Sequence, residues 1–588
     1  MKSYTLITSP VKTHKRNYKY FNYGCLNLLN NTSKKNILLN HPWDNHQNYF
    51  RDSQKIKKIY THILEKISQI LNNHHKIKKD LRYWKILIGP WLHSFIVAHY
   101  EKNLSIDLLL KSKKKMIIPV VDLSLESQIP DNFFTFFSKH IYDPSWNDFL
   151  FTTIISKKNL SKNFILKKKI STDKKNSKKK NGLNILNNLV KFLINFVSFI
   201  FLFRIRNQSL AFFNTYLSFR NKLFLIFRNL SLPIHLDKKS TYIYPDISLR
   251  KSLIKAIDSK NDFYNNILKL SVLNMPTDLL ENFSNVGKKI FKSNVALNPK
   301  VIFTANGIYG SSFEARYIAE CTSKGTKLIL AQHGGRYENI KNFFHIDYEV
   351  DISDYFISWG RKKNNSKIKN LGIIKPLKFL NKDNDKRQKI LFLMMAKGRF
   401  YRTIDSEINI KKLYNYYDNI CPNFYSLLKQ SLKERLIFRS SINNYWNEKE
   451  ILTKRCKFSE IDFDRHKSDL FSAVEKSRVV VCSYFSTTFM ELMSANIPVT
   501  LFTPFSHEGY NSETLKIFDI MSKSKIYFKS HEDSAKFVNK NWENINEWWF
   551  SKKVQKSRKI FLDYFSIENP RLIYDIQQLI DQSKKISN

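Results

Sequence analysis

The spacing of apolar residues predicts two long helices near the start of the chain. Between residues 54 and 71, apolar side chains recur every three or four positions, which makes one face of a helix apolar. The segment "LRYWKILIGPWLHSFIVAHY" that follows is apolar around most of a helix. Its Gly89-Pro90 pair predicts a kink or a restart, because proline lacks the backbone N–H that a helix needs. Trp84 and Trp91, on either side of this pair, are expected to be core residues.

From residue 300 onward, short apolar runs alternate with helical patterns. The runs that we interpret as strands end in loops, and they lie at 300–307, 326–337, 354–360, 389–399, 435–440, 478–488 and 497–504. Strand, helix and strand at this spacing predict parallel units, whose ligands bind beyond the carboxyl ends of the strands. The expected fold class is therefore α/β, with two Rossmann-like domains that face a cleft.

The domain boundaries follow from the same pattern. An N-terminal Rossmann-like domain is expected to carry extra helices and a lysine-rich insertion, and a second Rossmann-like domain is followed by helices that strap the two together. The expected ranges are 1–380 for the first domain, about 50–100 for its helical part, about 155–190 for the insertion, 381–545 for the second domain and 546–588 for the strap.

Composition adds a strong positive charge of +48, from 98 Lys and Arg against 50 Asp and Glu. Such a charge suits nucleic acid or an anionic membrane. The lysines are scattered, however, and no nucleic-acid motif with interleaved aromatic residues is present, so we expect no nucleic-acid partner. Residues 155–180 hold eleven lysines and one acid. This segment either contacts anionic lipid or is a solvated insertion.

The N-terminus and the cysteines bear on the compartment. "MKSYTLITSP" lacks an apolar signal region and is interpreted as a first strand. The five cysteines include no C-x-x-C pair, which disfavours a zinc site or a disulfide framework. The apolar segment Phe192 to Phe203 is too short to cross a bilayer. We expect a cytoplasmic protein, either free or peripheral at the inner membrane.

The turn after the strand at 478–488 contains three hydroxyl residues, Ser486, Thr487 and Thr488, with Glu491 one helical turn further on. A helix N-terminus offers unpaired amides and a partial positive charge, which suit a phosphate. Glu491 could accept hydrogen bonds from ribose hydroxyls. The alternative is ordinary capping by Thr487. Three hydroxyls beside an acid at a strand end favour nucleotide binding.

The sequence "AQHGGRY" places Gln332, His333, Gly334 and Gly335 in a loop after another strand. Paired glycines allow a ligand or a backbone to come close. The imidazole of His333 titrates near neutral pH, so it could act as a general base on an acceptor hydroxyl. Donation of a hydrogen bond to a donor phosphate is an equally good interpretation.

Basic residues at other strand ends are candidates for holding a leaving phosphate. Arg439, Lys397 and Arg399 occupy such positions in the second domain. "DFD" at 462–464 matches the D-x-D of metal-dependent transferases, but its place late in the chain favours a cap and a loop. We expect metal-independent chemistry and no cofactor.

Several blocks together resemble one family, that of surface-carbohydrate transferases first named from a leptospiral O-antigen cluster. The most specific block is "RYWKILIGPWL", and the others include "HPWDNHQNYFRDSQKI", "AQHGGRY", "SRVVVCSYFSTTFMELMSANIPVTLF" and "EWWFSKKVQKSRKIF". The family is similar to glycosyltransferases of the two-Rossmann (GT-B-like) type. One departure is Glu338, where the family pattern tends to have glycine.

The resemblance implies transfer of a sugar from a nucleotide-sugar to a lipid-linked or surface glycan, in O-antigen or related lipopolysaccharide biosynthesis. The first domain would bind the acceptor and the second domain the donor. The hydroxyl cluster is also similar to the motif that binds a CMP-sugar in bacterial sialyltransferases, although their His-Pro element is not evident here. Two alternatives stay open: a CDP-polyol phosphotransferase, and a non-enzymatic basic scaffold for membrane or nucleic acid.

Overall fold

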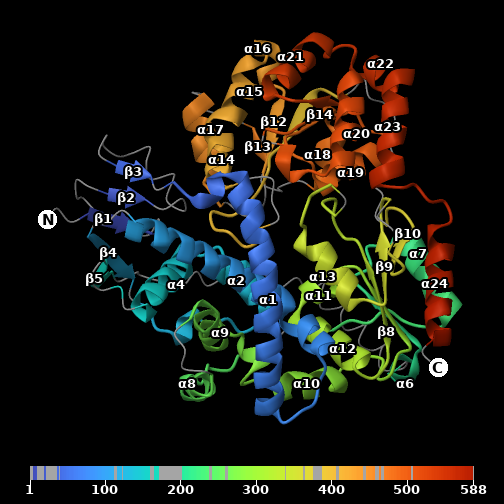
Figure 1. Ribbon diagram of the computed structural model, residues 1–588. Helices are drawn as coiled ribbons and strands as arrows, with labels where there is room; N and C mark the ends of the chain where they lie inside the picture. Colours follow the sequence, from blue (N-terminus) through green and yellow to red (C-terminus); the bar gives the residue numbers. More distant parts are fainter. Residues whose placement is uncertain are drawn as a thin grey trace, which may run out of the picture.

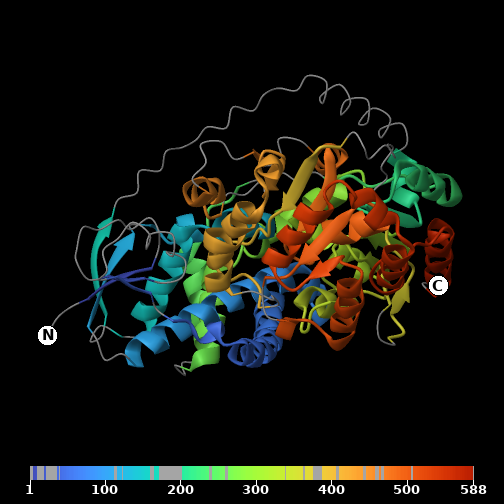
Figure 2. The ribbon, with the colours of Figure 1, turned by 90° about the horizontal axis from the view of Figure 1, so that it is seen from above.

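The computed structural model describes most of the chain. The described residues are 4–8, 19–21, 36–38, 40–111, 115–121, 123–158, 160, 164–170, 202–236, 242–257, 262–337, 339–361, 365–374, 387–404, 409–440, 445–456, 462–464, 469–504 and 507–586. They form three parallel sheets with helices around them (Figure 1). Figure 2 shows the first sheet at one end of the molecule and the C-terminal helix at the other. Residues 171–201 and Glu338 lie outside the described residues.

The first sheet has five parallel strands in the order β3-β2-β1-β4-β5. Its strands are β1 (Tyr4–Ile7), β2 (Lys19–Phe21), β3 (Asn36–Leu38), β4 (Met116–Val121) and β5 (Phe164–Ile170). The predicted N-terminal strand is present as β1, in the middle of this sheet. The sheet itself is an addition to the two that the sequence indicated.

The second sheet has the order β10-β9-β8-β7-β6, all parallel. Its strands are β6 (Leu210–Phe213), β7 (Val301–Thr304), β8 (Lys327–Ala331), β9 (Tyr355–Ser358) and β10 (Ile368–Asn370). The central strands are buried on both faces, as parallel strands covered by helices require.

The third sheet has the order β13-β12-β11-β14-β15-β16, again parallel throughout. Its strands are β11 (Lys389–Leu393), β12 (Leu436–Arg439), β13 (Phe463–Asp464), β14 (Ser477–Cys482), β15 (Val499–Phe502) and β16 (Tyr527–Phe528). This is the strand order of a doubly wound Rossmann sheet, with its switch point between β11 and β14. The predicted α/β class with two Rossmann-like sheets is confirmed.

Helices cover these sheets and connect them. The ones that matter for the site are α1 (His46–His75), α2 (Leu81–Lys111), α4 (Pro144–Lys157), α12 (Ser312–Thr322), α13 (Phe344–Ile352), α19 (Thr487–Ser494) and α20 (Ser512–Lys523). The others include α6 (Leu202–Asn207), α7 (Phe219–Asn229), α8 (Ile247–Lys255), α9 (Phe263–Asn274), α10 (Phe283–Lys292), α15 (Cys421–Leu427), α17 (Glu448–Cys456), α18 (Leu470–Glu475) and α21 (His531–Asn541). In the part of the chain that the structure describes, no helix has the length and apolar character needed to span a bilayer.

Helix α2 runs through the Gly89-Pro90 pair, so the restart, one of the two outcomes that this pair predicted, does not occur. Proline removes the N–H that would bond to the carbonyl of Ile86. The Tyr348 hydroxyl donates to this carbonyl instead, at 3.3 Å, and to Lys85 O at 3.1 Å. A side chain from α13 thus supplies a donor where the helix lacks one, while Trp84 and Trp91 are fully buried, as predicted.

The lysine-rich insertion is shorter than expected at its start. Residues up to Lys157 complete α4, and Phe164–Ile170 form the edge strand β5. The sequence prediction placed the end of α4 and all of β5 inside the insertion at 155–190, because their many lysines outweigh the few apolar residues that pack. Pairing with β4 and burial of Phe164 supply the stabilisation that the local sequence does not indicate.

The C-terminal helices α22 (Ile545–Phe550), α23 (Lys552–Phe565) and α24 (Leu572–Ile586) pass from the third sheet to the second (Figure 1). Helix α23 packs on α19 and α20, and α24 packs on α7, β7 and β8. Between α23 and α24, Ile567 pairs with the backbone beyond β9, where its N–H donates to Trp359 O at 2.8 Å. The end of the chain therefore contacts both Rossmann-like domains.

Candidate functional site

The loop after β8 and the start of α19 meet where the second and third sheets face each other. The N–H of Gly335 donates a hydrogen bond to Thr487 Oγ1 at 2.9 Å. Nearby, the Lys341 N–H donates to Gly509 O at 2.9 Å, and Ile340 forms a β-bridge with Tyr510. The two motifs that the sequence singled out, 150 residues apart, are brought into direct contact.

Gly335 is required by the closeness of this contact. A Cβ added to it would lie 2.5 Å from Met490 Sδ and 2.9 Å from the Thr487 backbone nitrogen. At Gly334 a Cβ would make only ordinary contacts, at 3.4 Å with Thr487 Oγ1 and 3.9 Å with Tyr337 Cε2. The paired glycines thus allow the backbone of α19 to come close. Gly335, the second of the pair, is the position where this contact leaves no room for a side chain.

The three hydroxyl residues of the cluster have different roles. Ser486 is the N-cap of α19, since its Oγ accepts a hydrogen bond from the Phe489 N–H at 3.1 Å. Capping therefore falls to Ser486, one residue before the position considered in the sequence. Thr487 accepts from Gly335 and keeps its own hydroxyl proton for donation. Thr488 is half-buried at the same helix end, and Glu491 is only 4% exposed.

Gln332 holds the loop in place. Its Oε1 accepts from the Trp359 N–H at 2.9 Å, and its Nε2 donates to Gly334 O at 2.8 Å. Because the side chain is fully buried, both ends of the amide are satisfied within the protein. Gln332 is thus a positioning residue for the glycine pair.

His333 belongs to a buried chain of hydrogen bonds. Its Nδ1 lies 2.8 Å from the Tyr337 hydroxyl, which lies 2.8 Å from Glu349 Oε1. The Tyr309 hydroxyl reaches the same carboxylate oxygen at 3.0 Å and lies 2.9 Å from His345 Nδ1. Glu349, on α13, is 1% exposed and stands at the centre of this chain.

The Tyr337 hydroxyl lies beside the His333 ring, 2.8 Å from Nδ1 and 3.4 Å from Nε2. A tyrosine hydroxyl has one proton, and a buried carboxylate is its strongest acceptor, so Tyr337 donates to Glu349. The contact positions the ring, and the tautomer is a matter for the proposed reaction.

The protonation state of His333 agrees with the role of a general base. Burial lowers the pKa of His333 to about 4, so the ring is neutral at pH 7. Its side chain is still 24% exposed, so one edge remains accessible. A neutral, oriented and reachable imidazole is suited to accept a proton.

Tyr337 and Glu349 received no role from the sequence. Tyr337 stands in the "AQHGGRY" block, four residues after His333, which is a usable signal for a local hydrogen bond. Glu349 lies on a separate helix, and nothing in its local sequence distinguishes it from a surface acid. Its role follows only from the packing of α13 under the loop.

The basic candidates are tied to neighbouring side chains. The Arg439 guanidinium forms a buried ion pair with Asp464, the last residue of β13. Arg399 lies over the Trp446 ring at 4.8 Å and donates to Tyr445 O. The Trp446 indole donates to Lys397 O at 3.0 Å. Lys397 and Arg399 lie in the loop beyond β11, and Arg439 is the last residue of β12.

The "DFD" segment is a strand and not the cap and loop that we expected. Phe463 and Asp464 pair with β12 in parallel register. Phe463 is buried, and the Asp464 charge is offset by Arg439 on the neighbouring strand, so both residues favour the sheet. Among the residues that the structure describes, no group of three or more His, Cys, Asp or Glu side chains is arranged to hold a metal ion.

Comparison with known proteins identifies the class. The model of the LIC12162 family of transferases matches residues 20–580. The chain therefore belongs to this family and is a transferase, as its sequence blocks indicated. Among curated proteins, none matches this sequence.

Solved structures with similar topology include three bacterial proteins. S. aureus MnaA with UDP shares 10% identity over 65% of this chain and 97% of that one, with a TM-score of 0.37. Acinetobacter baumannii MurG shares 11% sequence identity, over 64% of this chain and 99% of the MurG chain, with a TM-score of 0.33. WaaG, a glycosyltransferase involved in lipopolysaccharide biosynthesis, shares 10% sequence identity, over 63% of this chain and 99% of the WaaG chain, with a TM-score of 0.30.

Proposed function

We propose that the protein is a metal-independent glycosyltransferase that moves a sugar from a nucleotide-sugar to a glycan or lipid-linked acceptor. The observation that carries the proposal is the contact between Gly335 and Thr487. It joins a loop with an oriented imidazole to a helix N-terminus at the switch point of a Rossmann sheet. Membership in a transferase family supports an enzyme over a basic scaffold.

The donor phosphate would lie at the first turn of α19. Amides at this end have no partner within the helix, and the helix dipole favours negative charge there. Thr487 and Thr488 would add hydroxyl donors, whereas Glu491, only 4% exposed, is too buried for the ribose contact that the sequence predicted. Lys397 and Arg399 lie in the loop beyond β11 and would add positive charge near the leaving group, while the charge of Arg439 is offset by Asp464.

The reaction assigns His333 the role of general base. The acceptor hydroxyl gives its proton to His333 Nε2, and its oxygen forms a bond to the anomeric carbon. The bond from that carbon to the donor phosphate breaks, and its electron pair leaves with the nucleotide. In this proposal Nδ1 carries the ring proton, while Tyr337, bonded to Glu349, keeps the imidazole in position.

The biological setting proposed is synthesis of O-antigen or a related surface polysaccharide at the cytoplasmic side of the inner membrane. A CMP-sugar is the donor favoured by the hydroxyl cluster. These assignments rest on the sequence resemblance.

The test is release of nucleotide from a panel of nucleotide-sugars, measured with the native protein and with His333→Gln. We expect turnover of one donor and a loss of roughly a hundredfold or more in the variant. His62→Gln, an exposed histidine on α1, is the matched control and should keep native turnover. Release of CMP from a CDP-polyol, without any sugar transfer, would instead identify a polyol phosphotransferase.

A further inference from the structure

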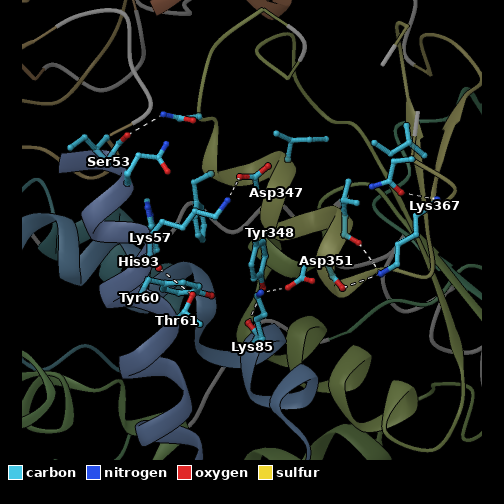
Figure 3. Close-up of a pocket in the computed structure, with 18 of the residues that line it drawn as sticks. Ser53, Lys57, Tyr60, Thr61, Lys85, His93, Asp347, Tyr348, Asp351 and Lys367 are labelled. Atoms are coloured by element: carbon cyan, nitrogen blue, oxygen red, sulfur yellow. Dashed lines mark hydrogen bonds and ion pairs between the residues drawn. The ribbon is translucent and has the colours of Figure 1, made fainter. Parts of the chain in front are cut away.

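A cavity of about 630 Å³ lies between α1, α2 and α13 (Figure 3). Its volume falls within the range of roughly 300–1,000 Å³ that is usual for ligand sites. Ile404, in the loop beyond β11, also lines it, so the cavity borders both Rossmann-like domains. It is separate from the turn at Ser486.

The charges in this cavity largely cancel. Lys57 Nζ lies 2.8 Å from Asp347 Oδ2, and Lys85 forms an ion pair with Asp351. Lys367 Nζ donates to backbone carbonyls in the last turn of α13, at 3.3 and 3.4 Å. A cation at a helix C-terminus is offset by the dipole. The lining thus favours an uncharged ligand over a phosphate or a carboxylate.

The same residues offer many hydrogen bonds to a neutral ligand. Each lysine–carboxylate pair presents donors and acceptors side by side, which suits a hydroxyl group that needs both. The Tyr60 hydroxyl is itself fully buried behind the lining, so the donors and acceptors open to a ligand are those of the lysine–carboxylate pairs.

Aromatic rings form the apolar wall. Phe344 is half-buried and stacks on His93 at 3.6 Å and on Tyr348 at 5.4 Å, while Tyr60 meets it edge-on. Gly89 makes this packing possible, since a Cβ there would lie 2.7 Å from both the Tyr348 ring and the Tyr60 hydroxyl. The wall is therefore built by Tyr60 of α1, His93 of α2, and Phe344 and Tyr348 of α13, which pack closely because Gly89 has no side chain.

We infer that this cavity binds an uncharged saccharide segment of the acceptor. Flat apolar faces beside paired donors and acceptors match the C–H faces and hydroxyl edges of sugar rings. The inference rests on the proposed function. Helix α13 connects the two sites, because Tyr348 lines the cavity and the next residue, Glu349, orients His333 through Tyr337.

The experiment measures binding of the full-length protein to an array of uncharged oligosaccharides and of the same sugars carrying sulfate or sialic acid. Saturation-transfer NMR then gives affinities for the best uncharged ligand. We expect uncharged sugars to be retained in preference to their anionic counterparts. Retention of no uncharged sugar, or of anionic sugars alone, would overturn the inference.

Two variants locate the binding. Thr61→Trp fills the cavity from an exposed position of α1, and Asp347→Ala leaves Lys57 without its carboxylate. Each should weaken saccharide binding at least fivefold. Tyr264→Ala, on α9 in a different groove between α1 and α9, is the matched control and should bind as the native protein does. Unchanged binding in both cavity variants would contradict the assignment.

Nucleotide binding separates this inference from the proposed function. Thr61→Trp should leave the thermal shift produced by the donor nucleotide unchanged, because the cavity is distinct from α19. Loss of saccharide binding with intact nucleotide binding supports the cavity as the acceptor site. If the protein bound saccharides but no nucleotide, the saccharide site in the cavity would be supported and the donor site at α19 would be contradicted.

Discussion

The backbone N–H of Gly335 lies 2.9 Å from Thr487 Oγ1, and this hydrogen bond joins two Rossmann-like domains at their ligand-binding edges. The glycine comes from the loop after β8 and the threonine from the first turn of α19. His333 is two residues before this glycine, and the unpaired amides of α19 adjoin the threonine. The relative position of base and phosphate site therefore depends on one close backbone contact.

Replacing Gly335 by alanine should disturb this contact. The new Cβ would lie 2.9 Å from the Thr487 nitrogen, which is backbone and not free to turn aside. Forced overpacking of this kind costs about 1–3 kcal/mol. We expect a lower free energy of unfolding by that amount in guanidinium titrations, together with loss of transfer. Gly334→Ala, whose Cβ has ordinary contacts, should be close to native in both measurements.

Replacing Tyr337 by phenylalanine tests the tautomer of His333. Without the hydroxyl, the His333 ring loses its polar contact at 2.8 Å from Nδ1 and is free to turn away from the proposed orientation, in which Nε2 is basic. The turnover number should fall roughly tenfold to a hundredfold, with KM for the donor nearly unchanged. Nitrogen-15 NMR of the histidine rings should show protonated Nδ1 at His333 in the native protein only.

The control for that substitution is Tyr317→Phe, which removes another buried hydroxyl, the donor to Ala296 O at 2.8 Å. Its effect should be limited to stability. Equal losses of turnover in the two variants, or a native His333 with its proton on Nε2, would refute the assigned orientation.

The pH dependence of the native protein should reflect the low pKa of His333. Burial lowers this pKa from 6.5 to about 4, so the acid limb of the rate profile should lie near the lower value. The unfolded chain binds the proton more readily than the folded protein. Stability should therefore fall as the pH drops from about 6.5 toward 4.

In His333→Gln this loss of stability should be smaller, as measured by guanidinium titrations at pH 7 and pH 5. Part of it should remain, because burial also lowers the pKa of His75, to about 4, and of His99, to about 3. An acid limb near pH 6.5 in the native protein would exclude His333 as the group that must be unprotonated.

Asp464 should be needed for stability and not for metal binding. Asp464→Asn leaves the Arg439 charge buried without its partner, which costs about 3–5 kcal/mol. The exposed Asp462 of the same segment is the control, and Asp462→Asn should change stability by less than about 0.5 kcal/mol. Chelation with EDTA should leave the melting temperature and the turnover of the native protein unchanged. If EDTA lowered the melting temperature or the turnover, and added metal ions restored it, the interpretation of this segment as a metal site would be correct after all.

Seven strands of the second and third sheets could be predicted from the sequence because each is a largely buried apolar run followed by a turn: β7, β8, β9, β11, β12, β14 and β15. The short strands β6, β10, β13 and β16 were missed. Val479, Val480 and Val481 illustrate this in β14, where every one is fully buried. The first sheet could not be predicted beyond β1. Its strands β2 and β3 have three residues each, and such short runs become strands only through pairing.

The candidate site was only partly predictable for a similar reason. His333 and the hydroxyl cluster stood out because glycines and hydroxyls at strand ends have few structural explanations. Glu349 did not, since its partners Tyr337 and Tyr309 come from other elements of the chain. The cavity beside α13 depends on the approach of three helices, and no local pattern reports such an approach.

The most direct test of the central claim is a thermal-shift measurement with CMP, CDP, UDP, GDP and dTDP on the native protein and on Thr488→Val. At a hundred times its dissociation constant, the correct nucleotide should stabilise the native protein by about 2.7 kcal/mol, and the variant should lose most of this gain. Absence of stabilisation by every nucleotide, or an equal shift in the variant, would contradict a donor site at the first turn of α19.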